Sequence, residues 1–199
     1  MLENFKNFLQ TNTDITDVQF EQIGMGLKCE KVEKGKLLLK ENQVCTHSFF
    51  VETGLLRAYT LDENGKEHII QFAPEKWIIS DRSSAYFDAP SQLYIDVIED
   101  AEIIYLEKDF VSKISEISPS FRMENERLLH NHIRHLQTRI NLLISASAEK
   151  RYMHFIELYP DLLLRVPLWM IASYLGITPE SLSRVRKELA RRNFKPNSK

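Results

Sequence analysis

The stretch that decides the fold is ASYLGITPESLSRVRKELARR, Ala172–Arg192. Its first part has apolar residues at helical spacing and stops at Gly176, a residue that readily adopts the positive φ of a tight turn. Thr178 then stands at the N-cap position, and Pro179 fills the first position of a second helix. Helix, glycine turn and capped helix together predict a helix-turn-helix.

The second helix of this stretch has two different faces. Its apolar residues recur at spacings of three and four and predict a buried face: Leu182, Val185 and Leu189. The opposite face is polar and mixed in charge: Glu180, Ser181, Arg184 and Lys187. Arginine can donate two hydrogen bonds to guanine and glutamate can accept one from cytosine, so this face suits base reading in the major groove. An ordinary surface helix with an i,i+4 ion pair is the alternative that the pattern leaves open.

Charge is distributed unevenly along the 199 residues. Residues 1–118 hold 12 Lys and Arg against 21 Asp and Glu, whereas residues 149–199 hold 10 against 5. An acidic front and a basic end predict two domains with different partners, and a basic region is what binding to nucleic acid requires.

The acidic front is rich in short apolar runs between Lys28 and Leu106. Gly54 is expected to divide two strands, and DENG at Asp62–Gly65 is typical of a hairpin loop. Many short strands at close spacing predict an antiparallel sandwich, roll or barrel. Before them, Thr16 followed by Gln19 predicts a capped helix.

A long helix is expected after Ser118, with Ser118 as N-cap and Pro119 in the first turn. Its apolar residues follow a 4-3-4-3 spacing: Leu129, Ile133, Leu136, Ile140 and Leu143. Such a narrow row is typical of a two-helix seam, so we expect homodimerisation. A helix lying on its own sheet is the alternative.

Composition excludes several classes of protein. No apolar run is long enough to cross a membrane, and the start of the chain lacks the apolar run of a signal peptide. Two cysteines, Cys29 and Cys45, are too few for a disulfide framework or for an all-cysteine iron–sulfur cluster within one chain. We therefore expect a cytoplasmic protein that contacts no membrane.

Four motifs resemble the Crp/Fnr family of transcription regulators: EKGKLLLKENQ, FFVETGLLRAY, DENGKEHIIQF and LGITPESLSRVRKEL. The resemblance implies an α+β fold with an N-terminal antiparallel β-roll of the cyclic-nucleotide-binding, jelly-roll type, a dimerisation helix and a C-terminal helix-turn-helix. It implies domains at residues 1–118, 119–146 and 147–199. It also implies that Glu180 and Arg184 read bases, while Thr178, Ser181 and Lys187 contact phosphate or neighbouring positions. The family's two-stranded wing is expected to be truncated, because few residues follow Arg192.

The phosphate-binding cassette of the family's cyclic-nucleotide sensors is altered in this chain. In those relatives a Gly-Glu pair opens the cassette and an Arg-Ser or Arg-Thr pair closes it. Here Ser80 and Asp81 stand at the opening, and Ser91 and Gln92 at the close. Strand alternation is expected to turn Arg82 away from an inward-facing Asp81. Burying a phosphate without a partner charge is costly, so we expect no binding of cyclic AMP.

Other chemistries find little support. His47, His68 and Cys45 could hold haem in principle, and the His132–His135 pair could hold a metal, but packing or solvated positions are the preferred interpretation. A cupin enzyme would need a His-x-His pair, and only His68 lies near such strands; no catalytic motif is present. We therefore expect no enzyme, no metal and no cofactor. The partners expected are double-stranded DNA, a second copy, an unidentified small-molecule effector and, for an activator, RNA polymerase. The alternative is a regulatory protein that binds a cyclic nucleotide or metabolite and acts on a protein partner.

Overall fold

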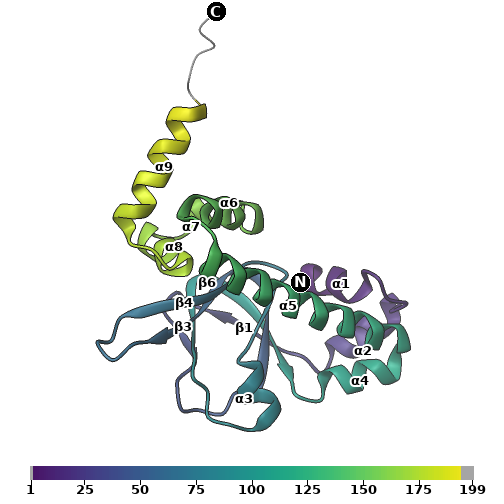
Figure 1. The fold of residues 1–199 in the computed structure, drawn as a ribbon. Helices are drawn as coiled ribbons and strands as arrows, with labels where there is room; N and C mark the ends of the chain where they lie inside the picture. Colours follow the sequence, from purple (N-terminus) through teal and green to yellow (C-terminus); the bar gives the residue numbers. More distant parts are fainter. Residues whose placement is uncertain (1, 194–199) are drawn as a thin grey trace, which may run out of the picture. The chain divides into compact units, whose positions relative to one another are not determined.

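The computed structural model describes residues 2–193 of the chain (Figure 1). It divides into two compact units, Met1–Lys66 with Ile70–Asn131 and Glu67–Ile69 with His132–Lys199. The predicted truncation of the wing concerns residues 194–199, which lie outside the described part. No helix within residues 2–193 has the length and apolar character needed to cross a membrane.

The first unit is built around a six-stranded sheet. Its strands are β1 Lys28–Val32, β2 Leu37–Leu39, β3 His47–Leu61, β4 Glu67–Ala73, β5 Ile78–Ile79 and β6 Tyr94–Glu107. The strand order is β1-β6-β3-β4, with β2 paired to β6 and β5 paired to β3. The pairings of β1, β2 and β3 with β6, and of β5 with β3, are antiparallel. The expected α+β class with a β-roll and a C-terminal helix-turn-helix is confirmed.

Gly54 does not divide two strands, and this expectation was wrong. It lies inside the single long strand β3, at a φ of 91°. The pairing of β3 with β6 shifts register on either side of it, as a β-bulge does. A Cβ at this position would lie 2.6 Å from the carbonyl oxygen of Asp100 in β6, so glycine allows the two strands to approach. Two apolar runs that could be separate strands, at residues 94–99 and 101–107, likewise form the single strand β6.

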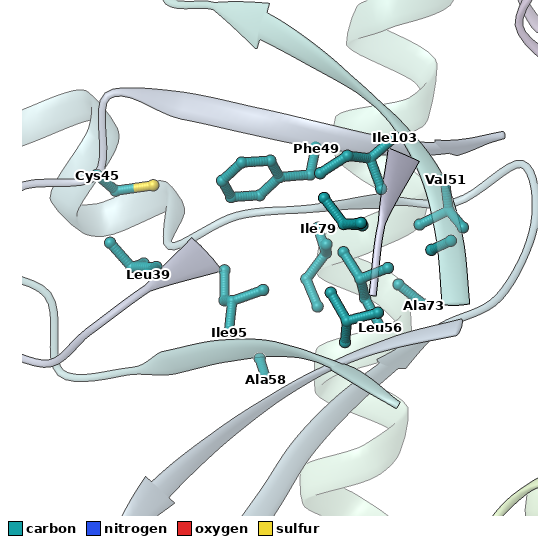
Figure 2. Close-up of a cluster of buried hydrophobic side chains, with 13 residues drawn as sticks. Leu39, Cys45, Phe49, Val51, Leu56, Ala58, Ala73, Ile79, Ile95 and Ile103 are labelled. Carbon is teal, nitrogen blue, oxygen red and sulfur yellow. The ribbon is translucent and has the colours of Figure 1, made fainter. Parts of the chain in front are cut away.

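The core of the roll is an apolar cluster to which each of the strands β1 to β6 contributes side chains. Figure 2 shows Phe49, Val51, Ile79 and Ile103 gathered at its centre. Each of these side chains is almost fully buried. The expected short strands therefore close around an apolar interior, as a roll requires.

A second cluster lies under the helices α1 Glu3–Gln10, α2 Asp17–Gly24 and α4 Phe110–Ile117. It is rich in phenylalanine, and Phe5 meets Phe50 edge-on with ring centroids 4.9 Å apart. The buried carboxylate of Glu52 accepts hydrogen bonds from the backbone N–H groups of Asn4 and Phe5, at 2.8 and 2.9 Å. The predicted capping box of Thr16 and Gln19 is present at the start of α2.

The long helix α5 spans Pro119–Ser145 and begins at the predicted proline. The hydroxyl of Ser118 donates to the carboxylate of Asp14, an interaction that the sequence did not predict. Phe121 and Glu124 are buried near the start of α5, and Glu124 accepts from Nε of Arg127 at 2.7 Å.

The second unit contains α6 Ala148–Leu158, α7 Leu162–Arg165, α8 Leu168–Leu175 and α9 Pro179–Asn193. Ser147 caps α6 by accepting from the N–H of Lys150 at 3.2 Å. The core of the unit includes Phe155, Leu175 and Leu182, all nearly or fully buried. The ring of Tyr174 packs against Phe155 and Tyr159 with centroids 5.4 and 5.8 Å apart.

Candidate nucleic-acid interface and sensor pocket

The turn between α8 and α9 is built as the sequence predicts. Gly176 has a φ of 64°, the left-handed conformation that ends α8. An added Cβ would also lie 3.2 Å from Cδ2 of Leu143 and 3.4 Å from Nη1 of Arg151, so the ends of these side chains would have to shift slightly to admit it. Two residues later, Oγ1 of Thr178 accepts from the N–H of Ser181 at 3.2 Å, which caps α9.

The two faces of α9 differ in burial. Leu182 is fully buried, and Val185 and Leu189 are half-buried. Glu180, Arg184 and Lys187 are exposed, while Ser181 is half-buried beside the cap. The described part of α9 therefore exposes both acidic and basic side chains, Glu180 and Glu188 as well as Arg184, Arg186 and Lys187.

Glu180 stays ionised in this setting. Its own backbone N–H, then the hydroxyl of Thr178 and the charge of Arg184, hold the pKa of its carboxyl below the ordinary value. An ionised carboxylate only accepts hydrogen bonds, and the guanidinium of Arg184 only donates them. One turn of the helix thus offers an acceptor and a donor side by side.

The apolar row on α5 is exposed in this single chain. The side chains of Leu129, Ile133, Leu136, Ile140 and Leu143 are between 38% and 54% exposed. Ile144, which the sequence analysis did not include, is 79% exposed. Isoleucine and leucine alternate along the row. In heptad terms, Ile133 and Ile140 take the a positions and the leucines take d, which is the combination that favours two parallel strands.

Asp81 organises the altered cassette. It caps the short helix α3, Arg82–Phe87, by accepting from the N–H of Ser84 at 3.0 Å. Its second carboxylate oxygen accepts from Oγ of Ser91 at 2.8 Å and from the N–H of Gln92 at 3.4 Å. Asp81 and Ser91 are buried, at 7% and 1% exposed. Three of the four expected residues therefore meet, while Ser80 is half-buried beside them.

Asp81 and Arg82 do not lie on a strand, so the expectation from strand alternation was wrong. Arg82 is exposed as the first residue of helix α3 rather than as an alternating strand residue. The groups that contact Asp81 are a hydroxyl and backbone amides. The carboxylate of Asp81 thus joins the two ends of the cassette by hydrogen bonds within the chain.

Two of the remaining candidate ligands, Cys45 and His47, contact neighbouring groups of the roll. Cys45 is buried, and its N–H donates to Oγ of Ser84 at 2.8 Å; burial raises the pKa of its thiol. The ring of His47 lies edge-on to Tyr105, with centroids 5.5 Å apart. Among the described residues, no group of three or more His, Cys, Asp or Glu could hold a metal ion.

Comparison with known proteins first defines the class of the roll. Residues 29–117 match the family model of the cyclic nucleotide-binding domain. These residues cover β1 to α4 and include the cassette around Asp81.

Most of the chain is similar to bacterial regulatory proteins. The anaerobic regulatory protein of Aggregatibacter actinomycetemcomitans is 26% identical over 165 residues, covering 77% of this chain and 63% of that protein. FixK2 from Bradyrhizobium japonicum has the same fold, with a TM-score of 0.69, 22% identity and coverage of 87% and 89% of the two chains. A structure from Eubacterium rectale, described as a crp/fnr family regulator, has a TM-score of 0.65 and 19% identity. The match covers 94% of this chain and 88% of that chain.

The resemblance to the Crp/Fnr family is confirmed as a similarity: the roll matches the cyclic nucleotide-binding domain, and bacterial regulatory proteins resemble the chain in sequence and in fold. The matched part of the chain spans about three fifths of the length of its relatives: 63% of the protein from Aggregatibacter actinomycetemcomitans and 60% of the anaerobic regulatory protein of Pasteurella multocida. These relatives are regulators by name rather than enzymes, in agreement with the expectation from the sequence.

Proposed function

We propose that the protein is a homodimeric, DNA-binding transcription regulator that reads a pseudo-palindromic operator with Thr178–Leu189. The main support for this proposal is the capped helix α9, which follows a left-handed glycine turn and exposes Glu180, Arg184 and Lys187. A helix of this kind enters the major groove with its N-terminal residues at the base edges.

The chemistry of α9 assigns a role to each side chain. Arg184 donates two hydrogen bonds to guanine, and Glu180 accepts from the amino group of cytosine. Lys187, Thr178 and Ser181 lie where they can contact phosphates or neighbouring positions, which anchor the helix without reading sequence. The exposed cations Arg186 and Arg191 add to the positive charge of the same helix.

Dimerisation supplies the symmetry that such reading needs. The exposed row Leu129–Leu143 combines isoleucine at a with leucine at d, and we propose that it pairs with the same row of a second copy. A two-fold dimer places two copies of α9 in successive major grooves, with half-site centres about 34 Å apart. The domain boundaries of this regulator are proposed at 118/119 and 146/147.

The roll does not bind cyclic AMP in this proposal. Asp81 already accepts the donors that close the cassette, and its negative charge would repel a cyclic phosphate. Ser91 and Gln92 offer no compensating cation. An effector of another chemical class remains part of the proposal, as do RNA polymerase as the partner of an activator and the cytoplasm as the location.

A band shift with random duplex DNA tests the proposal against the alternative regulator that acts on a protein partner. The double variant Arg184→Ala/Lys187→Ala removes two cations from α9. We expect wild type to shift the duplex at low salt and the variant to bind about tenfold or more weakly, since phosphate contacts dominate non-specific binding.

The matched control is Lys31→Ala/Lys34→Ala, which removes two exposed cations from the roll. We expect the control to bind DNA as wild type does. Equal weakening by both pairs would mean that total charge, and not α9, carries the binding. No shift by wild type at low salt would reject DNA binding itself.

A further inference from the structure

The C-terminal end of α8 leaves four carbonyl groups without partners inside the helix, as every α-helix does. The turn satisfies two of them. The N–H of Gly176 donates to the carbonyl of Ser173 at 3.0 Å, and the N–H of Ile177 donates to that of Ala172 at 3.0 Å. This is the hydrogen-bond pattern of a Schellman motif, which requires the left-handed residue that Gly176 supplies.

Two arginines from other helices take the remaining two carbonyls. Nη2 of Arg139, in α5, donates to the carbonyl of Tyr174 at 3.2 Å. Nη1 of Arg151, in α6, donates to the carbonyl of Leu175 at 2.6 Å. Cations at a helix C-terminus also meet the negative end of its dipole, so both contacts are charge-assisted. The four terminal carbonyls of α8 are thus all paired.

Helix α5 holds this turn at more than one point. The guanidinium of Arg139 lies 4.0 Å from the centroid of the Tyr174 ring, a cation–π contact. Its Nη2 also donates to the carbonyl of Ile69 at 3.0 Å, in the Glu67–Ile69 stretch of the same compact unit. One turn along α5, Leu143 lies against Gly176, where an added Cβ would be 3.2 Å from its Cδ2.

We propose that Arg139 and Arg151 are positioning residues for base reading: they fix the end of α8 and thereby the direction in which α9 leaves the turn. Only Gly176, Ile177 and Thr178 separate the two helices, so a change at the end of α8 is passed to α9 over one short turn. Arg139 lies on the helix that carries the exposed apolar row. The effect on base reading rests on the proposed function, whereas the effect on the end of α8 does not.

The contacts of Arg139 and Arg151 with the end of α8 are called the clamp below. Hydrogen–deuterium exchange of the free protein tests this clamp without DNA. Arg139→Met and Arg151→Met keep an unbranched apolar stem and remove the donors. We expect exchange of the amides in residues 172–182 to become roughly tenfold faster in each, as removal of a charge-assisted hydrogen bond implies. Arg134→Met is the control, because it removes an exposed cation from the same helix and should leave these amides unchanged.

The second arm measures DNA binding with an operator selected by the wild-type protein from random duplexes. Both Met variants should show about tenfold less preference for that operator over random duplex, while the salt dependence of random-duplex binding stays as in wild type. A positioning role predicts this split, since phosphate contacts are less demanding of orientation than base contacts.

Lysine variants keep the test decisive if a Met variant fails to fold. Arg139→Lys and Arg151→Lys retain charge and one donor, and should recover most of the protection of residues 172–182. Arg151→Lys also removes a buried Nε that has no acceptor among residues 2–193. Exchange equal to that of Arg134→Met in both Met variants would overturn the clamp. If wild type selects no operator, the proposed function fails while the exchange comparison still decides on the clamp.

Discussion

Asp81 illustrates how far a residue can be interpreted from sequence. Its place at the opening of the cassette follows from the motif, and the structure shows that its side chain is buried. The partners of its carboxylate do not follow, because Ser91 and the amide of Gln92 reach it only through the fold of the intervening segment. The sequence predicts that the arginine of the cassette is missing, and the structure shows which donors the Asp81 carboxylate binds.

Replacing Asp81 with asparagine should destabilise the protein by about 1–3 kcal/mol, because the new amide group would direct donors at donors. The free energy of unfolding in urea measures this. Asp88→Asn is the control: its ion pair with Lys108 is exposed, and we expect a cost below about 1 kcal/mol. Equal costs would mean that the buried hydrogen bonds of Asp81 contribute no more than a surface pair.

Gly176 sets the turn through both its dihedral angle and its lack of a side chain. Gly176→Ala should cost about 1–2 kcal/mol for the left-handed conformation, with a further cost for the contact to Leu143. Thermal unfolding of the full chain measures it.

Gly24→Ala provides the comparison, since a Cβ at that helical position meets no atom within 4 Å. It should be neutral or stabilising by up to about 1 kcal/mol. If both alanine variants melt alike, the geometry of the Gly176 turn has no special energetic weight.

At the scale of elements, the sequence predicts the existence of strands and helices better than their limits. The apolar runs of the roll do form strands, as predicted, but the predicted break between two strands at Gly54 is wrong. Glycine serves equally as a strand end and as a bulge, and only the approach of Asp100 and Ala101 in β6 distinguishes the two. The clamp on α8 was not predicted either. Arg139 and Arg151 lie 35 and 24 residues from the carbonyls they bind, and no local pattern signals them.

The row on α5 gives a prediction at this scale. Ile133→Lys/Leu136→Lys would place like charges against each other in a paired seam, so the protein should become monomeric. Light scattering at several protein concentrations measures the mass.

His135→Lys/Asn141→Lys is the matched control on the same helix, because both residues are exposed and lie outside the a and d positions. It should remain dimeric. A dimer that persists in Ile133→Lys/Leu136→Lys would show that another surface holds the two copies together.

At the scale of the whole molecule, the uneven charge separates two tasks. Residues 1–118 are acidic, and residues 149–199 are basic. If the proposed function holds, the acidic roll would be repelled by a duplex and the cations of α9 attracted to it, which would orient the chain before any base is read. A formal net charge of -2 over the whole chain is therefore compatible with the proposed binding of DNA through the basic end.

The central claim, that α9 reads DNA sequence, is tested most directly by selecting binding sites from random duplexes with wild type, Arg184→Ala and Lys187→Ala. Wild type should select a pseudo-palindrome. Arg184→Ala should relax the preference for one guanine in each half-site, at a cost of about 1–3 kcal/mol. Lys187→Ala should keep the selected sequence, weaken all duplexes similarly and lower the salt slope by about one unit for each phosphate that the lysine neutralises. An unchanged preference in Arg184→Ala, or an equal change of preference in Lys187→Ala, would contradict the account.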